Sequence, residues 1–229
     1  MTLPASIAAL VAQPGKGRAV VFDADGTLWR GDVGEDFLRY LAANNLLVSR
    51  PREGAYAQYE ALNHHDPVAS YAYGVTVMAG MGEDELHLHA GTFFRQRFAG
   101  RVFPYVRPLL AQLEANGFDV WVCSASPRWA VEAGAVALGL PKARVIAVES
   151  EVSDGRLTSK LLAPVVAGPG KVTWLKRKGV APLLAIGNGD LDLDMLAFAT
   201  HAWVVAPPDG SRSMLVREAI ARGWPISRF

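Results

Sequence analysis

Little in this sequence is typical of a secreted, membrane-spanning or nucleic-acid-binding protein. Its 229 residues include a single cysteine, Cys123, so no disulfide can form within the chain. Basic residues (23) and acidic residues (22) almost cancel to a net charge of +1, and there is no long basic run that would attract a nucleic acid or an anionic membrane. The apolar stretch from Ile7 to Val11 is too short for a signal peptide or a membrane span. We therefore expect a cytoplasmic protein with no nucleic acid and no membrane among its partners.

The chain has enough apolar residues to bury a core, and these residues fall in short runs. Hydrophobic residues make up 51% of the sequence and charged residues 20%, a balance typical of folded domains. Short β-branched or aromatic runs alternate with helical patterns such as residues 108–116 and 129–138, and this alternation predicts βαβ units around a parallel sheet. The fold class is therefore α/β. The expected strands cover residues 18–22, 118–123, 144–148, 183–186 and 202–205.

One long segment interrupts this alternation. Residues 31–104 contain no strand-like run, and such a segment is too long for a structureless loop. We therefore expect an α-helical cap domain at 31–104, inserted into a core domain formed by residues 1–30 and 105–229. The Asp-Gly turn within residues 153–158 also predicts a small hairpin apart from the main sheet. Helical patterns of the insert lie at residues 35–47, 56–62 and 83–98.

Two acidic residues follow the first predicted strand. Asp23 and Asp25 stand in the motif Asp-Ala-Asp-Gly-Thr-Leu, directly after Phe22. Ligands of open parallel sheets bind beyond the carboxyl ends of the strands, so we expect both carboxylates in the site. One carboxylate can attack a phosphorus atom while the other protonates the leaving oxygen and later activates water. Taken alone, the motif is also compatible with a solvated Asp-Gly turn.

Two further motifs suit a bound anion. Ser124 and Ala125 stand in Cys-Ser-Ala-Ser-Pro after the second core strand, where a hydroxyl and backbone N–H groups at a helix start can cradle an anion. Lys171 opens a predicted helix in Gly-Pro-Gly-Lys and could neutralise that anion. Each has an ordinary alternative, because a serine often only caps a helix and a lysine at a helix start is usually solvated. The lysine motif is not a P-loop, since Val165 and Val172 replace its required glycine and hydroxyl residue.

Oxygen-bearing side chains cluster after the strand predicted at residues 183–186. The segment from Gly187 reads Gly-Asn-Gly-Asp-Leu-Asp-Leu-Asp-Met and offers Asn188, Asp190 and Asp192. Amide and carboxylate oxygens are the ligands that Mg²⁺ prefers, and Mg²⁺ commonly shares them with a phosphate. An acidic helix start favoured by the helix dipole is the alternative interpretation. Together with the preceding motifs, each at a strand end, the segment indicates a phosphate site with magnesium.

The four motifs resemble those of the haloacid dehalogenase (HAD) superfamily of phosphohydrolases, over roughly Val20 to Ala206. Asp-Ala-Asp-Gly-Thr-Leu matches the first family motif residue for residue, and the insert falls where helical caps of the first type occur. The resemblance implies a Rossmann-like parallel sheet with a helical cap. It also implies that Asp23 forms an aspartyl-phosphate and that Asp25 is the general acid/base. Ser124 and Lys171 would hold the phosphoryl group. The acid at Asp25 argues for phosphate esters, because dehalogenases of this superfamily do not need it.

The same resemblance implies that Mg²⁺ is held by the Asp23 carboxylate, the Asp25 carbonyl and the fourth motif. That motif usually reads Gly-Asp-x-x-x-Asp, and two alignments fit this chain. One places Asn188 and Asp192 at the key positions, and the other places Asp190 and Asp194 there. We prefer the first, because Gly187 then directly follows the strand. Asp190 could compensate for the charge that an asparagine ligand lacks, so the metal-contacting residue stays open.

The motif pattern and the hairpin look most like the phosphoserine phosphatase branch. In that branch an acid after the nucleophile and a cap arginine bind the substrate's amino acid, and Asp32 and Glu35 are the candidate acids. Trp29 could flank the organic part of the substrate, although core packing is the commoner role of such a tryptophan. The candidate arginines are Arg30, Arg39, Arg52 and Arg95.

These observations predict a Mg²⁺-dependent phosphomonoester hydrolase for a small phosphorylated metabolite, phosphoserine-like or an amino-alcohol phosphate. Two alternatives remain. A phosphotransferase or mutase would use the same aspartyl-phosphate, and a catalytically silent binding module would retain only the fold. A monomer and a homodimer are equally compatible with the sequence.

Overall fold

The computed structural model describes residues 3–48, 54–207 and 213–228. Its contacts divide the chain into two compact units, the first formed by residues 1–31, 101–123 and 167–229 and the second by residues 32–100 and 124–166. The domains predicted from the sequence were a cap at residues 31–104 and a core at 1–30 and 105–229, so residues 124–166 fall in a different group here. Residues 124–166 group with the helical insert because α5 packs on α7 and α4 on β5.

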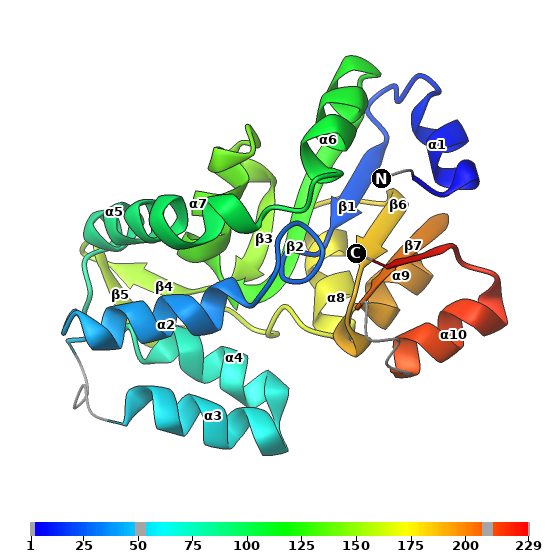
Figure 1. The fold of residues 1–229 in the computed structure, drawn as a ribbon. Coiled ribbons are helices and arrows are strands. Elements are labelled where there is room, and N and C mark those ends of the chain that lie inside the picture. Colours follow the sequence, from blue (N-terminus) through cyan, green and yellow to red (C-terminus); the bar gives the residue numbers. More distant parts are fainter. Residues whose placement is uncertain (1–2, 49–53, 208–212, 229) are drawn as a thin grey trace. The chain divides into compact units, whose positions relative to one another are not determined.

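The first unit carries most of the main sheet. Its elements are α1 (Ala5–Val11), β1 (Ala19–Phe22), α6 (Val106–Ala115), the start of β2 (Asp119–Pro127), α8 (Pro169–Arg177), β6 (Pro182–Gly187), α9 (Leu193–Phe198), β7 (His201–Ala206), α10 (Met214–Arg222) and β8 (Ile226–Arg228). A single 3₁₀ turn, Asp190–Asp192, precedes α9. Helix α9 packs on β6 and β7, and α10 packs on β7 (Figure 1).

Strand β1 is central and entirely buried, because its residues Ala19–Phe22 are all apolar. It pairs in parallel with β2 on one side and with β6 on the other, and the strand order of the six-stranded sheet is β3-β2-β1-β6-β7-β8. The chain leaves β1 at Asp23 and leaves β6 at Asn188. The carboxyl ends of these two neighbouring strands are where a parallel sheet of this kind binds its ligand.

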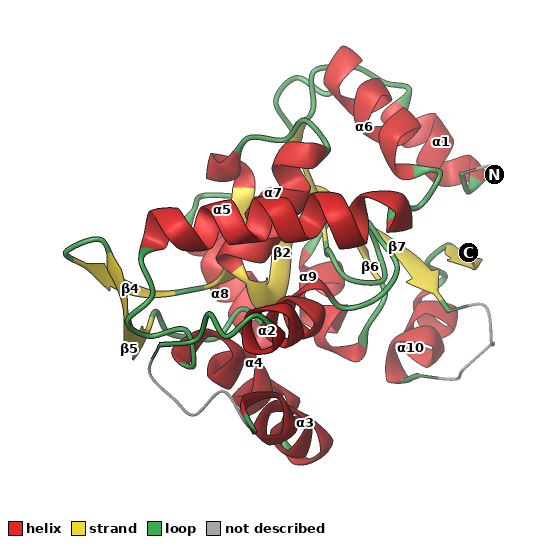
Figure 2. Ribbon diagram, turned by 60° about the vertical axis from the view of Figure 1, so that its left-hand side comes forward, coloured by secondary structure: helices red, strands yellow, loops and turns green. Residues whose placement is uncertain are grey.

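The second unit is mainly helical. Its elements are α2 (Val33–Ala43), α3 (Ala55–His65), α4 (Pro67–Thr76), α5 (Glu83–Phe93), a π-helical turn (Phe94–Phe98), the 3₁₀ turn Ala99–Arg101, α7 (Arg128–Ala137), the 3₁₀ turn Lys142–Arg144, β3 (Val145–Val148), β4 (Ser150–Ser153) and β5 (Arg156–Leu161). Strands β4 and β5 form the two-stranded antiparallel hairpin that the Asp-Gly turn predicted (Figure 2). Phe37 of α2 lies 5.3 Å from Phe93 of α5, ring centre to ring centre.

All five predicted strands are present with shifts of a few residues at their ends. Helices α1, α4 (Pro67–Thr76) and α10 and strand β8 were not predicted, because their short amphipathic or mixed sequences carry a weak periodic signal. Within the described residues, no helix has the length and apolar character needed to cross a bilayer.

Candidate active site

The turn after β1 places Asp23 against the neighbouring strand. The backbone N–H of Asp23 donates to the Ile186 carbonyl at 2.8 Å, which continues the pairing of β1 with β6. Gly26 has φ of +74°, a conformation suited to glycine. A side chain at this position would also be excluded sterically, because its Cβ would lie 2.0 Å from the Asn188 amide nitrogen. The glycine therefore lets the first and fourth motifs approach each other.

Lys171 is the centre of a buried ion cluster. It lies in the first turn of α8, after Gly168 and Pro169, and its side chain is 1% exposed. Its ammonium nitrogen lies 2.7 Å from Asp23 Oδ1, 2.5 Å from Asp192 Oδ1 and 2.8 Å from the Cys123 carbonyl. These three bonds use all three ammonium donors. The solvated lysine that we weighed as an alternative is therefore wrong.

Asp192 links Lys171 to the loop after β6. Its second carboxylate oxygen accepts hydrogen bonds from the backbone N–H groups of Asn188 (3.0 Å) and Gly189 (2.9 Å). The Thr27 hydroxyl lies 3.3 Å from Asp23 Oδ2 and 3.3 Å from the Asn188 side-chain oxygen. Asn188 and Asp192, the pair in the preferred alignment, are thus both connected to Asp23.

Asp190 has a different contact. Its carboxylate accepts the backbone N–H of Leu215 at 2.8 Å, at the start of α10, and the residue is exposed. Asp194 is exposed as well. The alignment through these two residues therefore supplies no buried carboxylate to Lys171. Asp190 was proposed as a metal ligand, and its bond to α10 gives it a structural role that the sequence did not reveal.

Burial controls the protonation of this cluster. Burial and, after it, the Asp192 carboxylate together raise the pKa of Asp23 to about 7, although Lys171 opposes both. For Lys171, burial alone would lower the pKa, but the two carboxylates raise it well above its usual range. Burial also raises the pKa of the Cys123 thiol to about 12. The cysteine therefore stays protonated at neutral pH and is a poor nucleophile.

Asp25 is held by an aromatic residue from its own turn. The indole N–H of Trp29 donates to Asp25 Oδ1 at 2.7 Å, and the tryptophan is fully buried. The sequence suggests that Trp29 either flanks the substrate or packs in the core; in the structure its ring is buried and its N–H points at the carboxylate of the candidate acid.

Ser124 and Ala125 belong to the second unit, where β2 extends to Pro127 before α7 begins. The Ser124 hydroxyl is buried and accepts the Ser126 N–H at 3.1 Å, and Ala125 is partly exposed. Helix α2 approaches this turn closely, because a Cβ at Gly34 would lie 2.6 Å from the Pro127 ring. The serine motif is thus the end of a strand rather than a helix cap.

Asp32 and Glu35 also lie in the second unit, at the start of α2. Asp32 is the N-cap residue and accepts the Glu35 N–H at 2.8 Å. Burial raises the pKa of Asp32 to about 6, although the hydrogen bond from the Glu35 N–H acts to lower it. The Glu35 carboxylate is 2.6 Å from Arg39 and 2.6 Å from the Tyr56 hydroxyl. Both acids therefore have structural partners.

We expect Asp32→Ala to lower the free energy of unfolding by about 1 kcal/mol, because it removes the N-cap acceptor. At about pH 4, Asp32→Asn keeps an acceptor and should leave stability nearly unchanged, because the raised pKa of Asp32 costs stability only at higher pH. Urea unfolding of the two variants beside the wild type measures the difference. Equal stability of the alanine and asparagine variants would show that the cap contributes nothing.

The candidate arginines make local contacts. Arg39 pairs with Glu35, and Arg95 donates to Thr92 at 3.3 Å. Arg30 lies over the Phe103 ring at 5.4 Å. Arg52 is outside the described residues.

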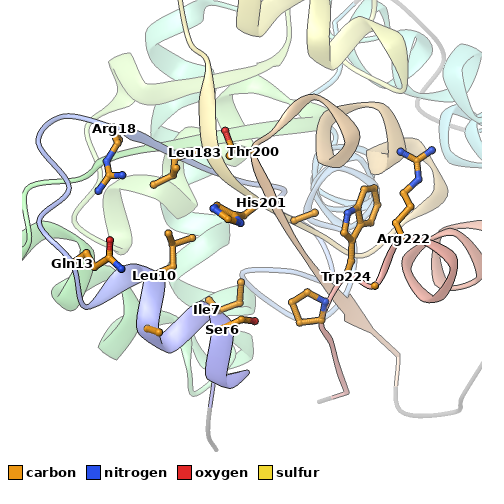
Figure 3. A pocket seen from close by; sticks show the side chains of 14 residues that line it. Ser6, Ile7, Leu10, Gln13, Arg18, Leu183, Thr200, His201, Arg222 and Trp224 are labelled. Atoms are coloured by element: carbon orange, nitrogen blue, oxygen red, sulfur yellow. The ribbon is translucent and has the colours of Figure 1, made fainter.

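The first unit also has a cavity of about 670 Å³, at the other end of the strands. It is lined by residues that precede the strands, such as Arg18 before β1 and His201 at the start of β7, and by Arg222 and Trp224 (Figure 3). The Arg18 guanidinium is bonded to the Gly15 and Pro14 carbonyls. Because catalytic groups of such sheets lie at the carboxyl ends, we assign no catalytic role to this cavity.

Comparisons with known proteins identify relatives of this chain in sequence and in fold. The chain is 31% identical over 185 residues to a phosphoserine phosphatase of Streptomyces coelicolor and 30% identical over 194 residues to phosphoserine phosphatase SerB2 of Mycobacterium tuberculosis. The alignments cover 78% and 80% of this chain but only 42% of each relative, so the chain spans less than half of their length. In fold it is similar to a Bordetella pertussis Tohama I protein of unknown function, with a TM-score of 0.75, 20% identity, and coverage of 92% of this chain and 98% of that one. The family model for haloacid dehalogenase-like hydrolases matches residues 20–197. The chain belongs to the haloacid dehalogenase-like hydrolase family.

Proposed function

We propose that this protein hydrolyses phosphate monoesters of small metabolites through an aspartyl-phosphate on Asp23. The observation that carries the proposal is the buried contact of Lys171 with Asp23, 2.7 Å from ammonium to carboxylate, directly after the central strand. A carboxylate there is oriented and charge-balanced, as a nucleophile toward an anionic ester must be.

In the proposed reaction, Asp23 attacks phosphorus while the bond from phosphorus to the ester oxygen breaks. Asp25 gives its proton to the departing oxygen, so an alcohol leaves. A water molecule then attacks the phosphorus of the aspartyl-phosphate, and Asp25 takes a proton from it. Inorganic phosphate leaves, and both carboxyl groups return to their starting states. The Lys171 ammonium stays next to Asp23 throughout and offsets negative charge on the phosphoryl group.

The oxygen atoms near Asp23 suit Mg²⁺. The Asn188 side-chain oxygen and Asp23 Oδ2 lie at 3.3 Å on either side of the Thr27 hydroxyl, and hard cations bind such oxygen donors. Among the described residues there is no group of three or more carboxylate, histidine or cysteine side chains suited to a metal. An asparagine and a backbone carbonyl are therefore needed, and we assign Asp23, the Asp25 carbonyl and Asn188 as ligands. Asp192 would orient them through Lys171 and the Asn188 N–H. The ion would supply further positive charge to the phosphoryl oxygens.

The substrate class rests on the curated relatives. Both are phosphoserine phosphatases, and the alignments cover 78% and 80% of this chain. We therefore propose a phosphoserine-like or amino-alcohol phosphate as substrate. The family resemblance also makes Ser124 and the Ala125 N–H candidates to bind the phosphoryl group. Asp32 or Glu35 would face the substrate's ammonium group.

A panel of phosphate monoesters, assayed with Mg²⁺ and with excess EDTA, tests the proposal. We expect phosphate release that requires Mg²⁺ and is greatest for amino-alcohol or amino-acid phosphates. Transfer to added alcohols in place of phosphate release would identify a phosphotransferase. No turnover of any ester by folded protein would contradict catalysis altogether.

A further inference from the structure

The side chain of Trp29 makes a polar contact with Asp25, the candidate general acid. Its indole nitrogen lies 2.7 Å from Asp25 Oδ1, four residues earlier in the chain. The turn between them is tight, because the Gly26 N–H donates to the Trp29 carbonyl at 2.8 Å and Asp25 and Trp29 form a β-bridge. This turn brings the indole ring of Trp29 back to the Asp25 carboxylate.

The surroundings of Trp29 keep its ring in place. Trp29 is fully buried and forms an antiparallel bridge with Val102. On either side of it, the Leu28 carbonyl accepts the Phe103 N–H and the Arg30 N–H donates to the Arg101 carbonyl, each at 3.0 Å. A buried ring on a backbone fixed on both sides cannot easily change rotamer.

An indole N–H only donates, so Asp25 Oδ1 must act as an acceptor in this contact. When Asp25 is protonated, its proton is therefore on Oδ2. The plane of a free aspartate carboxyl group is only broadly restricted. The bond from Trp29 fixes that plane and selects the oxygen that exchanges the proton.

We propose that Trp29 is a positioning residue that holds Asp25 Oδ1 so that Oδ2 delivers the proton to the leaving oxygen. This inference rests on the proposed phosphatase function. Trp29 acts through Asp25 and does not touch the substrate.

Trp29→Phe tests the inference, because it keeps an aromatic ring and removes the N–H. General acid catalysis contributes about 10²–10⁴-fold, and a misplaced acid should forfeit part of that factor, about tenfold. The loss should depend on the leaving group. An alkoxide needs the proton, whereas nitrophenolate leaves without it. We expect kcat/KM for an alkyl phosphate to fall about tenfold and kcat/KM for p-nitrophenyl phosphate to change less than about twofold.

The matched control is Trp203→Phe. Trp203 is also fully buried in the first unit, and its indole N–H donates to the Ser227 hydroxyl at 3.1 Å. This variant loses a comparable hydrogen bond but should keep the wild-type ratio of alkyl to aryl kcat/KM. Asp25→Asn should show the same selective loss as Trp29→Phe, in stronger form.

The inference is overturned if Trp29→Phe keeps the wild-type ratio of alkyl to aryl kcat/KM while Asp25→Asn lowers it. An equal fall of kcat/KM for both esters in Trp29→Phe counts as keeping that ratio. If Asp25→Asn shows no selectivity in an active enzyme, the acid role itself fails, and this inference with it. Absence of all turnover in the wild type would contradict the proposed function instead.

A second measurement does not depend on the folding of Trp29→Phe. In ¹H–¹⁵N spectra of protein labelled at its six tryptophans, one indole resonance should move strongly in Asp25→Asn. That resonance should not be the one that Trp203→Phe removes. If no indole resonance other than that of Trp203 moves, the contact with Asp25 is absent in solution and the proposal is wrong.

Discussion

Replacing Asp23 by asparagine is expected to lower kcat for phosphate release by at least about 10³-fold, while the protein stays folded. Asparagine is nearly the same size and can still accept a bond from Lys171, but it cannot form the aspartyl-phosphate. Phosphate release and circular dichroism on the same sample measure both effects. Asp194→Asn, an exposed change in α9, is the control and should retain wild-type activity. Full activity in Asp23→Asn would contradict the mechanism.

The same substitution should change the pH dependence of stability without metal. The folded pKa of Asp23 is about 7, against an ordinary value of 3.8. A carboxyl with a raised folded pKa gives stability below its unfolded pKa, which is lost as the pH rises through the folded value. The Asp23→Asn variant has no carboxyl group to ionise at this position, so its stability does not fall in this way as the pH rises. Urea unfolding should show the variant close to wild type near pH 4, and increasingly stable relative to wild type as the pH rises to about 8. A gap that shrinks as the pH rises would contradict the buried ionised cluster.

Lys171→Met is expected to have the largest effect on stability. It leaves the carboxylates of Asp23 and Asp192 buried without their shared cation, and breaking a buried ion pair costs about 3–5 kcal/mol. Activity should fall as well, by about 10²-fold or more, because the phosphoryl group loses its neutralising charge. The loss of stability should be smaller at about pH 5 than at about pH 8, since the stranded carboxylates can protonate. Urea unfolding at both values measures it.

Two variants control this experiment. Lys176→Met lies on the same helix at an exposed position and should change stability by less than about 0.5 kcal/mol. The double variant Lys171→Met/Asp192→Asn removes one of the two stranded charges and should recover part of the loss. If Lys171→Met is as stable as Lys176→Met, the cluster does not exist as described.

The sequence predicted the sheet well because its strands are short apolar runs with local boundaries. It predicted that Asp23 and the fourth motif lie together, because both follow strands. It could not show that Lys171 is buried, since that depends on carboxylates from two other strand ends. Nor could it show the bond of Asp190 to the Leu215 N–H, because α10 itself was not predicted.

The role of Asp32 was available locally and was missed. Asp32-Val-Gly-Glu35 has the spacing of a helix start just before the apolar pair Phe37 and Leu38. The cap that forms there is therefore a local feature of the sequence. Trp29 was different, because burial and the direction of an indole N–H follow from the backbone bridge to Val102.

The close approach of Gly26 to Asn188 has an evolutionary consequence. A methyl group at position 26 would lie 2.0 Å from the Asn188 amide, and 2.8 Å from the carbon that bears it. Any larger residue at position 26 would have to displace the Asn188 side chain, and the left-handed backbone would still disfavour the exchange. Substitutions at positions 26 and 188 are therefore expected to be correlated among related sequences, although most of the chain separates the two positions.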